Sequence, residues 1–215
     1  MDFNFKNIDK IDFFFSKRLS SKDALGEKVF LLNQKHSDKV FIIKHPKDLI
    51  LSPKADAVIT NLCDVAIGVK TADCLPILIF DTNKLVIAAI HSGWKGTVKQ
   101  IAIKTVKKMK EVFNSDFKDI VVMFGPAICG ECYSVGSDVI DEFKKILKYD
   151  FYIQRNSKYY IDLKTINRNM LVEIGIDKEK IFIHPDCTFC KHEIYQSFRY
   201  HKNTSNFQIS YIRII

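Results

Sequence analysis

At residues 75–90 the chain reads Leu75-Pro76-Ile77-Leu78-Ile79-Phe80, then Asp81-Thr82-Asn83-Lys84, then Leu85-Val86-Ile87-Ala88-Ala89-Ile90. Two apolar runs of six residues flank a polar segment that is typical of a turn. Runs of this length are typical of buried strands, and they are far shorter than the about 18–20 apolar residues of a membrane span. The stretch therefore predicts a hairpin of two buried strands.

Other segments with strand or helix patterns lie on both sides of this hairpin. Further strands are predicted at residues 11–15, 28–32, 40–43, 57–60, 65–69, 119–124, 180–184 and 206–214. Helices are predicted at residues 97–113, 137–148 and 162–174, with Ser137 and Asp162 as N-caps and Gly175 just past the last helix. Because strands and helices mix without regular alternation, we predict an α+β fold with mixed β-sheets flanked by helices, not a Rossmann fold.

The composition is that of a globular protein. The chain has 215 residues, of which 47% are hydrophobic, and its 17 Phe and 8 Tyr exclude disorder as the main state. We expect one domain over residues 1–215. Lys and Arg number 33 against 25 Asp and Glu, so the net charge is +8. The lysines are scattered, and the densest group lies on one predicted helix, so nucleic acid is not the favoured partner.

The cysteines and the start of the chain indicate a compartment. No secretory signal opens the chain, and no membrane partner is expected. We therefore expect a cytoplasmic protein, in which cysteines are thiols or metal ligands more often than disulfides. Two C-x-x-C pairs stand out, and 54 residues separate them; the cysteines are Cys129 and Cys132, then Cys187 and Cys190. A structural zinc site, redox-labile thiols and ordinary thiols are the three interpretations.

The hairpin brings two reactive residue types together. If Thr82-Asn83 is a two-residue tip, Cys74 lies directly opposite His91, with Cβ atoms about 4.5–5.5 Å apart. That separation suits a thiolate–imidazole pair or two ligands of one metal. The alternative is that Cys74 is a small buried hydrophobe and His91 a hydrogen-bonded core histidine.

The segment after His91 has features of an anion site. Its sequence is Ser92-Gly93-Trp94-Lys95-Gly96-Thr97, and the predicted helix follows. Glycines beside a helix start let backbone N–H groups approach a phosphate or carboxylate, and Lys95 adds charge. A tight strand-to-helix turn is the alternative. Trp94, the only tryptophan, either stacks on a flat ligand such as a base or fills the core.

A series of motifs, in order along the chain, resembles the laccase-domain family, also called the multicopper polyphenol oxidase or purine nucleoside phosphorylase-like family, which includes peptidoglycan editing factors. The matching segments are Asn33-Gln34-Lys35-His36, Ala55-Asp56-Ala57, Thr71-Ala72-Asp73-Cys74-Leu75-Pro76, Ala89-Ile90-His91-Ser92-Gly93-Trp94-Lys95-Gly96-Thr97, Gly125-Pro126-Ala127-Ile128, Cys132-Tyr133-Ser134-Val135, Asp162-Leu163, Cys187-Thr188 and Ser197-Phe198-Arg199. The resemblance covers about residues 33–212.

The resemblance implies one zinc ion, or copper in older proposals, bound by His36, Cys74 and His91. It also implies a fold similar to the catalytic domain of cytotoxic necrotizing factor. Family members are credited with phosphorolysis of adenosine, inosine and guanosine, with adenosine deamination and with cleavage of methylthioadenosine. Asp73, beside a ligand, is expected to orient a histidine or accept a proton, or else to be a turn carboxylate.

The phosphate site implied here consists of the Gly93–Thr97 turn with Lys95 or Arg199. The family usually has Gly-Trp-Arg-Gly where this chain has Gly93-Trp94-Lys95-Gly96. Lysine keeps the charge but loses the bidentate fork, so weaker phosphorolysis is expected.

Three function hypotheses follow from the sequence. The leading one is a zinc-dependent purine nucleoside enzyme, a monomer or homodimer that uses phosphate. The runner-up is a cysteine hydrolase or amidase with Cys74 as nucleophile and His91 as base, which would edit peptidoglycan precursors. The third is a nucleic-acid or partner-binding module. Polyphenol oxidase (laccase) chemistry is disfavoured, because one triad cannot supply several copper sites.

Overall fold

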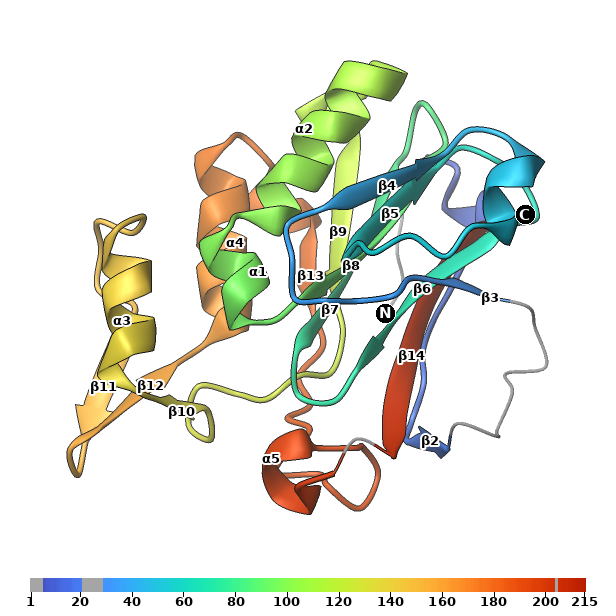
Figure 1. Ribbon diagram of the computed structural model, residues 1–215. Helices are drawn as coiled ribbons and strands as arrows, with labels where there is room; N and C mark the ends of the chain where they lie inside the picture. Colours follow the sequence, from blue (N-terminus) through green and yellow to red (C-terminus); the bar gives the residue numbers. More distant parts are fainter. Residues whose placement is uncertain (1–5, 21–28, 204) are drawn as a thin grey trace.

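A computed structural model of the chain describes residues 6–20, 29–203 and 205–215. The predicted α+β fold is confirmed: within these residues, three β-sheets, two of which contain both parallel and antiparallel pairs, combine with a few helices (Figure 1). Among the described residues, none of the helices is long and apolar enough to cross a membrane.

The central sheet has six strands. Their order is β13 (Ile181–Ile183), β9 (Ile120–Phe124), β7 (Leu75–Asp81), β8 (Val86–Ser92), β5 (Ala57–Thr60) and β4 (Val40–Ile43). The outer pairs, β13 with β9 and β4 with β5, are parallel, and the other pairs are antiparallel. The predicted hairpin of residues 75–90 is therefore the middle of this sheet.

Two smaller sheets accompany the central one. One is ordered β1 (Ile11–Phe15), β14 (Asn206–Ile214), β6 (Ala66–Thr71) and β3 (Val29–Leu31), and β2 (Leu19–Ser20) also pairs with β14. The other is ordered β10 (Ser134–Val135), β12 (Lys158–Ile161) and β11 (Tyr152–Arg155).

The helices are short. The α-helices are α1 (Trp94–Val98), α2 (Ile101–Phe113), α3 (Ser137–Lys144), α4 (Leu163–Glu173) and α5 (Phe198–His201). The 3-10 helices are η1 (Ile8–Lys10), η2 (Pro46–Ile50), η3 (Phe117–Asp119) and η4 (Lys178–Lys180).

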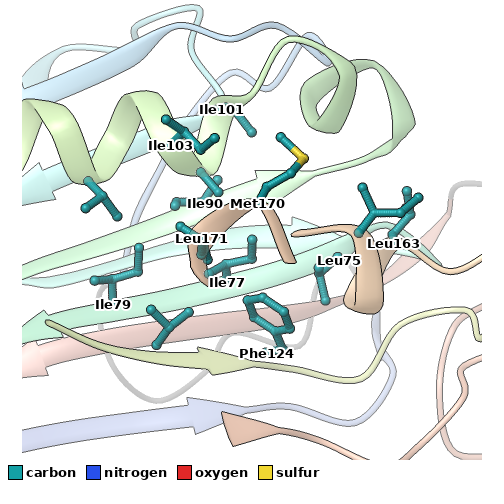
Figure 2. Close-up of a cluster of buried hydrophobic side chains, with 14 of the residues drawn as sticks. Leu75, Ile77, Ile79, Ile90, Ile101, Ile103, Phe124, Leu163, Met170 and Leu171 are labelled. Atoms are coloured by element: carbon teal, nitrogen blue, oxygen red, sulfur yellow. The ribbon is translucent and has the colours of Figure 1, made fainter. Parts of the chain in front are cut away.

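Both faces of the central sheet are covered, which explains the uninterrupted apolar runs. On one face, Ile77 and Ile79 of β7 pack with residues of α2 and α4, as Figure 2 shows. On the other face, Leu78 and Phe80 pack against β6 and β14 of the second sheet. Alternate residues of one strand thus enter two different cores, and every residue of β7 and β8 is buried.

The register of the hairpin differs from the prediction. Pro76, not Cys74, lies opposite His91, and the loop is the four residues 82–85 instead of a two-residue tip. Two features widen the turn. The side chain of Asp81 accepts hydrogen bonds from the backbone N–H groups of Asn83 and Lys84, and Leu85 adopts a left-handed conformation with φ 52°.

Several predicted boundaries also need correction. The single helix expected at residues 97–113 is two helices, because Gln100 has φ 60° and interrupts the helical path. Gly136 is the N-cap of α3, so Ser137 is the first helical residue, and α3 ends at Lys144. The Asp162 cap is confirmed, since its side chain accepts a hydrogen bond from the Lys164 N–H.

The other predicted strands are present with ends shifted by at most two residues, and residue 28 lies outside the described residues. Strands β2, β10, β11 and β12 and helix α5 were not predicted. The four strands are only two to four residues long, too short to show a clear periodicity.

Candidate active site

The chemically reactive residues lie at one end of the strands of the central sheet. Cys74 precedes β7, His91 is near the end of β8, and His36 precedes β4. Because β7 and β8 are antiparallel and β4 runs with β5, these positions fall at the same edge. The ligand atoms of the three side chains lie within 4.8 Å of one another. The structure thus brings together the three residues that the sequence analysis selected as metal ligands.

The mutual arrangement of these side chains is compact. The Cys74 sulfur lies 3.9 Å from Nε2 of His36. The two imidazole rings are 4.7 Å apart between centroids and inclined by 80°. Since Pro76 is opposite His91, Cys74 is a diagonal neighbour of His91 instead of its direct partner. The residue opposite His91 is therefore two positions further along the chain than predicted. The thiol of Cys74 and the imidazole of His91 are still close together.

Asp56, immediately before β5, organises both histidines. Its fully buried carboxylate lies 2.8 Å from Nδ1 of His91. It also accepts hydrogen bonds from the backbone N–H groups of Lys35, His36 and Ser37 and from the Ser37 hydroxyl. His36 has φ 55°, a conformation that these backbone bonds stabilise. One carboxylate therefore orients His91 and fixes the loop that carries His36.

These neighbours shift the pKa values of the site. Burial raises the pKa of the Cys74 thiol, but the charge of His91 and the hydrogen bond with His36 outweigh burial and bring it down to about 6. Burial lowers the pKa of His91, whereas the charges and hydrogen bonds of Cys74 and Asp56 raise it to about 9. For Asp56, burial is outweighed by hydrogen bonds from His91 and Ser37, so its pKa is well below its usual range. The lowered pKa of Cys74 and the raised pKa of His91 both favour a thiolate–imidazolium pair.

Gly93 leaves the space that the site needs. A Cβ atom at this position would lie 2.8 Å from the Cys74 sulfur and 3.3 Å from Cδ2 of His36. Its backbone, with φ −76° and ψ −180°, is open to any residue. The glycine is therefore required by close approach and not by conformation.

A cavity of about 820 Å³ opens over the three ligand residues. This volume lies within the usual range for small-molecule sites. The basic side chains in its lining are Lys35, Lys70, Lys95, Arg199 and Lys202, and the aromatic ones are Trp94, Tyr133, Phe198 and Phe207. Asp73 is the only acidic residue that the described part of the chain contributes to the lining. The cavity thus offers flat apolar surface together with positive charge.

Some of the residues predicted to bind phosphate line the cavity, and others do not. Trp94, Lys95 and Arg199 line the cavity. The Arg199 guanidinium lies 5.4 Å from the centre of the Tyr133 ring and donates hydrogen bonds to Ser134. Trp94 is half-buried, packs against the core and also lines the cavity, so stacking on a flat ligand stays a prediction.

Gly93 and Thr97 are not among the lining residues. Thr97 is fully buried, and its hydroxyl donates to the Gly93 carbonyl and accepts a hydrogen bond from Asn167. These hydrogen bonds connect α1 to α4, and the role of Thr97 in binding phosphate stays a prediction. Gly93 leaves free the space beside the Cys74 sulfur that a Cβ atom would fill.

The hydrogen-bond partners of Asp73 that the structure shows are not histidines. Its buried carboxylate accepts hydrogen bonds from the hydroxyls of Thr188 and Ser197 and from the backbone N–H of Arg199. It therefore holds the segment that carries Arg199 beside the cavity. Asp56, not Asp73, receives a histidine.

The sequence reasoning gave no role to Asp56 or Tyr133. Both occur in the motifs Ala55-Asp56-Ala57 and Cys132-Tyr133-Ser134-Val135, which was the signal available. Tyr133 lines the cavity, and burial raises the pKa of its hydroxyl. It is therefore a neutral ring with a polar tip, suited to a ligand that is both aromatic and polar.

Comparison with known proteins places this site in context. The family described as multi-copper polyphenol oxidoreductase laccase matches residues 15–215. The adenosine deaminase RL5, from an unknown prokaryotic organism, is 36% identical over 67% of this chain and 56% of its own length. Purine nucleoside phosphorylases of Clostridium acetobutylicum and Aquifex aeolicus are 37% and 38% identical over 80% and 78% of this chain and 70% and 75% of theirs. The chain thus spans a little over half of the deaminase and about three quarters of the phosphorylases.

Solved structures share the fold. The protein YfiH of Bacillus licheniformis superposes with a TM-score of 0.82 and 27% identity, over 87% of this chain and 74% of that one. A Neisseria meningitidis protein superposes with a TM-score of 0.77 and 28% identity, over 88% and 76%. With the match over residues 15–215, the chain belongs to the multi-copper polyphenol oxidoreductase laccase family.

Proposed function

We propose that this chain is a zinc-dependent enzyme of purine nucleosides, which cleaves them with phosphate and also deaminates adenosine. The observation that carries the proposal is the convergence of His36, Cys74 and His91 at the base of a cavity with aromatic and basic walls. The names of the relatives, purine nucleoside phosphorylase and adenosine deaminase, support it.

The residues present fit a catalytic zinc site. Two imidazoles and one thiolate are three protein ligands, the number that leaves a position open for reaction. The anionic Asp56 accepts a hydrogen bond from Nδ1 of His91, which leaves Nε2 as the ligand atom. When bound, zinc supplies Lewis-acid activation of a nucleophile at neutral pH.

Copper oxidase chemistry has less support. Among the described residues, two groups of side chains could hold a metal, and only this one contains histidine. A multicopper oxidase needs several copper sites with imidazole ligands. We therefore propose zinc and not a copper cluster.

The chain's own residues account for the recognition of the purine nucleoside and of phosphate. Half-buried Trp94 and Tyr133 present rings on which a purine base can stack. Arg199, held by Ser134, and the exposed Lys95 provide positive charge for phosphate beside the ribose. In phosphorolysis, phosphate replaces the base at C1′ and yields the free base and ribose 1-phosphate. In deamination, water replaces the amino group at C6 and yields inosine and ammonia.

The test uses purified, zinc-loaded protein with adenosine, inosine, guanosine or methylthioadenosine, with and without phosphate. Chromatography should show free base only when phosphate is present, and inosine from adenosine in both conditions. Cys74→Ala is the inactive variant, and Cys63→Ser, which changes an exposed cysteine outside the site, is the matched control. Product formation equal to that of Cys74→Ala in every assay rejects the proposal.

A second candidate function, the cysteine hydrolase or amidase, is favoured by one observation. Cys74, His91 and Asp56 form a nucleophile, base and orienting carboxylate, and the pKa of Cys74 is lowered to about 6. Alkylation separates the two functions. A Cys74 that reacts only after zinc is removed supports the zinc enzyme, whereas a Cys74 that reacts equally in zinc-loaded protein supports the hydrolase.

A further inference from the structure

The two C-x-x-C pairs come together in the fold, in a group separate from His36, Cys74 and His91. Cys129 and Cys132 lie in the segment between β9 and β10, and Cys187 and Cys190 lie between β13 and α5. The four sulfur atoms all lie within 4.8 Å of one another. Residues 58 positions apart in the chain, such as Cys132 and Cys190, are therefore neighbours.

The parallel pairing of β9 with β13 explains why the pairs meet. Parallel strands end at the same sheet edge, so the segments that follow β9 and β13 leave the sheet side by side. A bridge between Ala127 and Cys187 continues this pairing beyond the strands. The pairs are thus held close together by the backbone.

The spacing of the sulfur atoms suits one tetrahedral ion. A zinc–sulfur distance of about 2.3 Å implies sulfur atoms about 3.8 Å apart. The sulfurs of Cys132 and Cys190 are 3.4 Å apart, and the whole group stays within 4.8 Å. Four thiolates in this arrangement are typical of zinc or of an iron–sulfur centre. The space between the atoms admits a single ion and not a cluster of several irons.

The surroundings are those of a negatively charged sulfur centre. The backbone N–H groups of Cys129 and Cys190 lie within hydrogen-bonding distance, 3.3 and 3.5 Å, of the Cys187 sulfur. The buried ammonium group of Lys164 interacts electrostatically with Cys187 and Cys129. Its Nζ also donates hydrogen bonds to the carbonyl groups of His184 and Asp186, just before Cys187. Such donors and a nearby cation offset the net charge of four thiolates around a divalent ion.

We propose that Cys129, Cys132, Cys187 and Cys190 bind a structural zinc ion, separate from the ion proposed at His36, Cys74 and His91. A closed set of four protein ligands leaves no open position for water or substrate. This zinc therefore stabilises the fold and takes no part in catalysis. It joins the segment that carries the cavity residue Tyr133 to the segment that carries Thr188, a hydrogen-bond partner of Asp73. Tyr133 directly follows Cys132, and Thr188, whose hydroxyl donates a hydrogen bond to Asp73, directly follows Cys187.

The first test measures zinc per chain in tag-free protein produced with zinc and purified under reducing conditions. Wild type should hold two zinc ions, and Cys74→Ala should hold one. The double variant Cys132→Ser/Cys190→Ser should lose one ion relative to wild type, and Cys63→Ser should lose none. If only the proposed function is wrong, wild type and Cys74→Ala hold the same single ion. Zinc-free Cys74→Ala protein overturns the structural site.

The second test identifies the ligands and does not need the double variant to fold. X-ray absorption of zinc in Cys74→Ala should show four sulfur neighbours at about 2.3 Å. Removal of that zinc with a chelator should increase amide hydrogen exchange in the segments 127–133 and 187–190. Nitrogen or oxygen ligands, iron in place of zinc, or a disulfide in the untreated protein each contradicts the proposal.

Discussion

The carboxylate of Asp56 lies 2.8 Å from Nδ1 of His91, and both groups are buried. The same carboxylate binds the backbone of residues 35–37, so it couples the orientation of one proposed ligand to the position of another. The geometry of the proposed metal site thus depends on a residue that does not itself contribute a ligand atom.

Asp56→Asn tests this coupling. The amide can donate to Nδ1 of His91 and so favours the wrong tautomer for metal binding through Nε2. We expect zinc affinity at this site to fall about 10- to 100-fold, measured by competition with a chelator. Asp81→Asn is the control, because Asp81 is equally buried but lies at the opposite end of β7. Equal affinities of Asp56→Asn and wild type would contradict the role of Asp56.

Gly93→Ala tests the space beside the sulfur. The new Cβ would lie 2.8 Å from the Cys74 sulfur, so the thiol must move. We expect activity to fall about 100-fold, the cost of displacing a reacting group by about 1 Å, while the melting temperature changes little. The matched control is Gly96→Ala in the same turn, where the nearest atom is Cγ2 of Ile101 at 3.3 Å. The idea fails if Gly93→Ala is as active as Gly96→Ala.

The pH dependence of Cys74 alkylation is a third test, made on metal-free protein. The thiolate is the reactive form, and the pKa of Cys74 is lowered to about 6. The alkylation rate should therefore be maximal above this value and fall as the pH drops through about 6. In the urea-unfolded chain the midpoint should return to about 8.5. Mass spectrometry of the Cys74 peptide measures both, and a folded-state midpoint near 8.5 would show that His91 exerts no such effect.

Much of the fold was predictable because strands buried on both faces of the central sheet have uninterrupted apolar sequences. Residues 75–80 and 85–90 are apolar throughout since alternate side chains enter different cores. The register was not predictable. It depends on the Asp81 side chain bonding to the turn and on the left-handed Leu85, which no periodicity encodes.

The site was predictable in part for a related reason. Cys74 and His91 are near neighbours through the hairpin, and a shift of two residues keeps them on one face. The resemblance to a family supplied His36. The role of Asp56 and the meeting of the two C-x-x-C pairs depend on strand order, here β4 beside β5 and β9 beside β13, which a single sequence does not reveal.

Lys95→Gln tests the source of positive charge for phosphate. Lys95 is exposed, and exposed charge pairs contribute at most about 1 kcal/mol, so we expect the KM for phosphate to rise by no more than about fivefold. The value of kcat should not change. Lys107→Gln, which alters an exposed lysine of α2, should leave the KM unchanged. A loss of activity above 100-fold in Lys95→Gln would instead place Lys95 at the reacting atoms.

Thr97→Val separates a structural from a substrate-binding role for this threonine. The substitution keeps the shape but removes the hydroxyl that bonds Gly93 and Asn167 in the interior. We expect the free energy of unfolding to fall by about 1–3 kcal/mol in urea titrations, because the buried partners lose their hydrogen bonds. The KM values for nucleoside and phosphate should stay within about twofold, since the hydroxyl is not exposed to the cavity. Thr105→Val, which removes a buried hydroxyl bonded to Ile101 within α2, should destabilise without changing KM. A raised KM for phosphate with unchanged stability would instead support a substrate-binding role for Thr97.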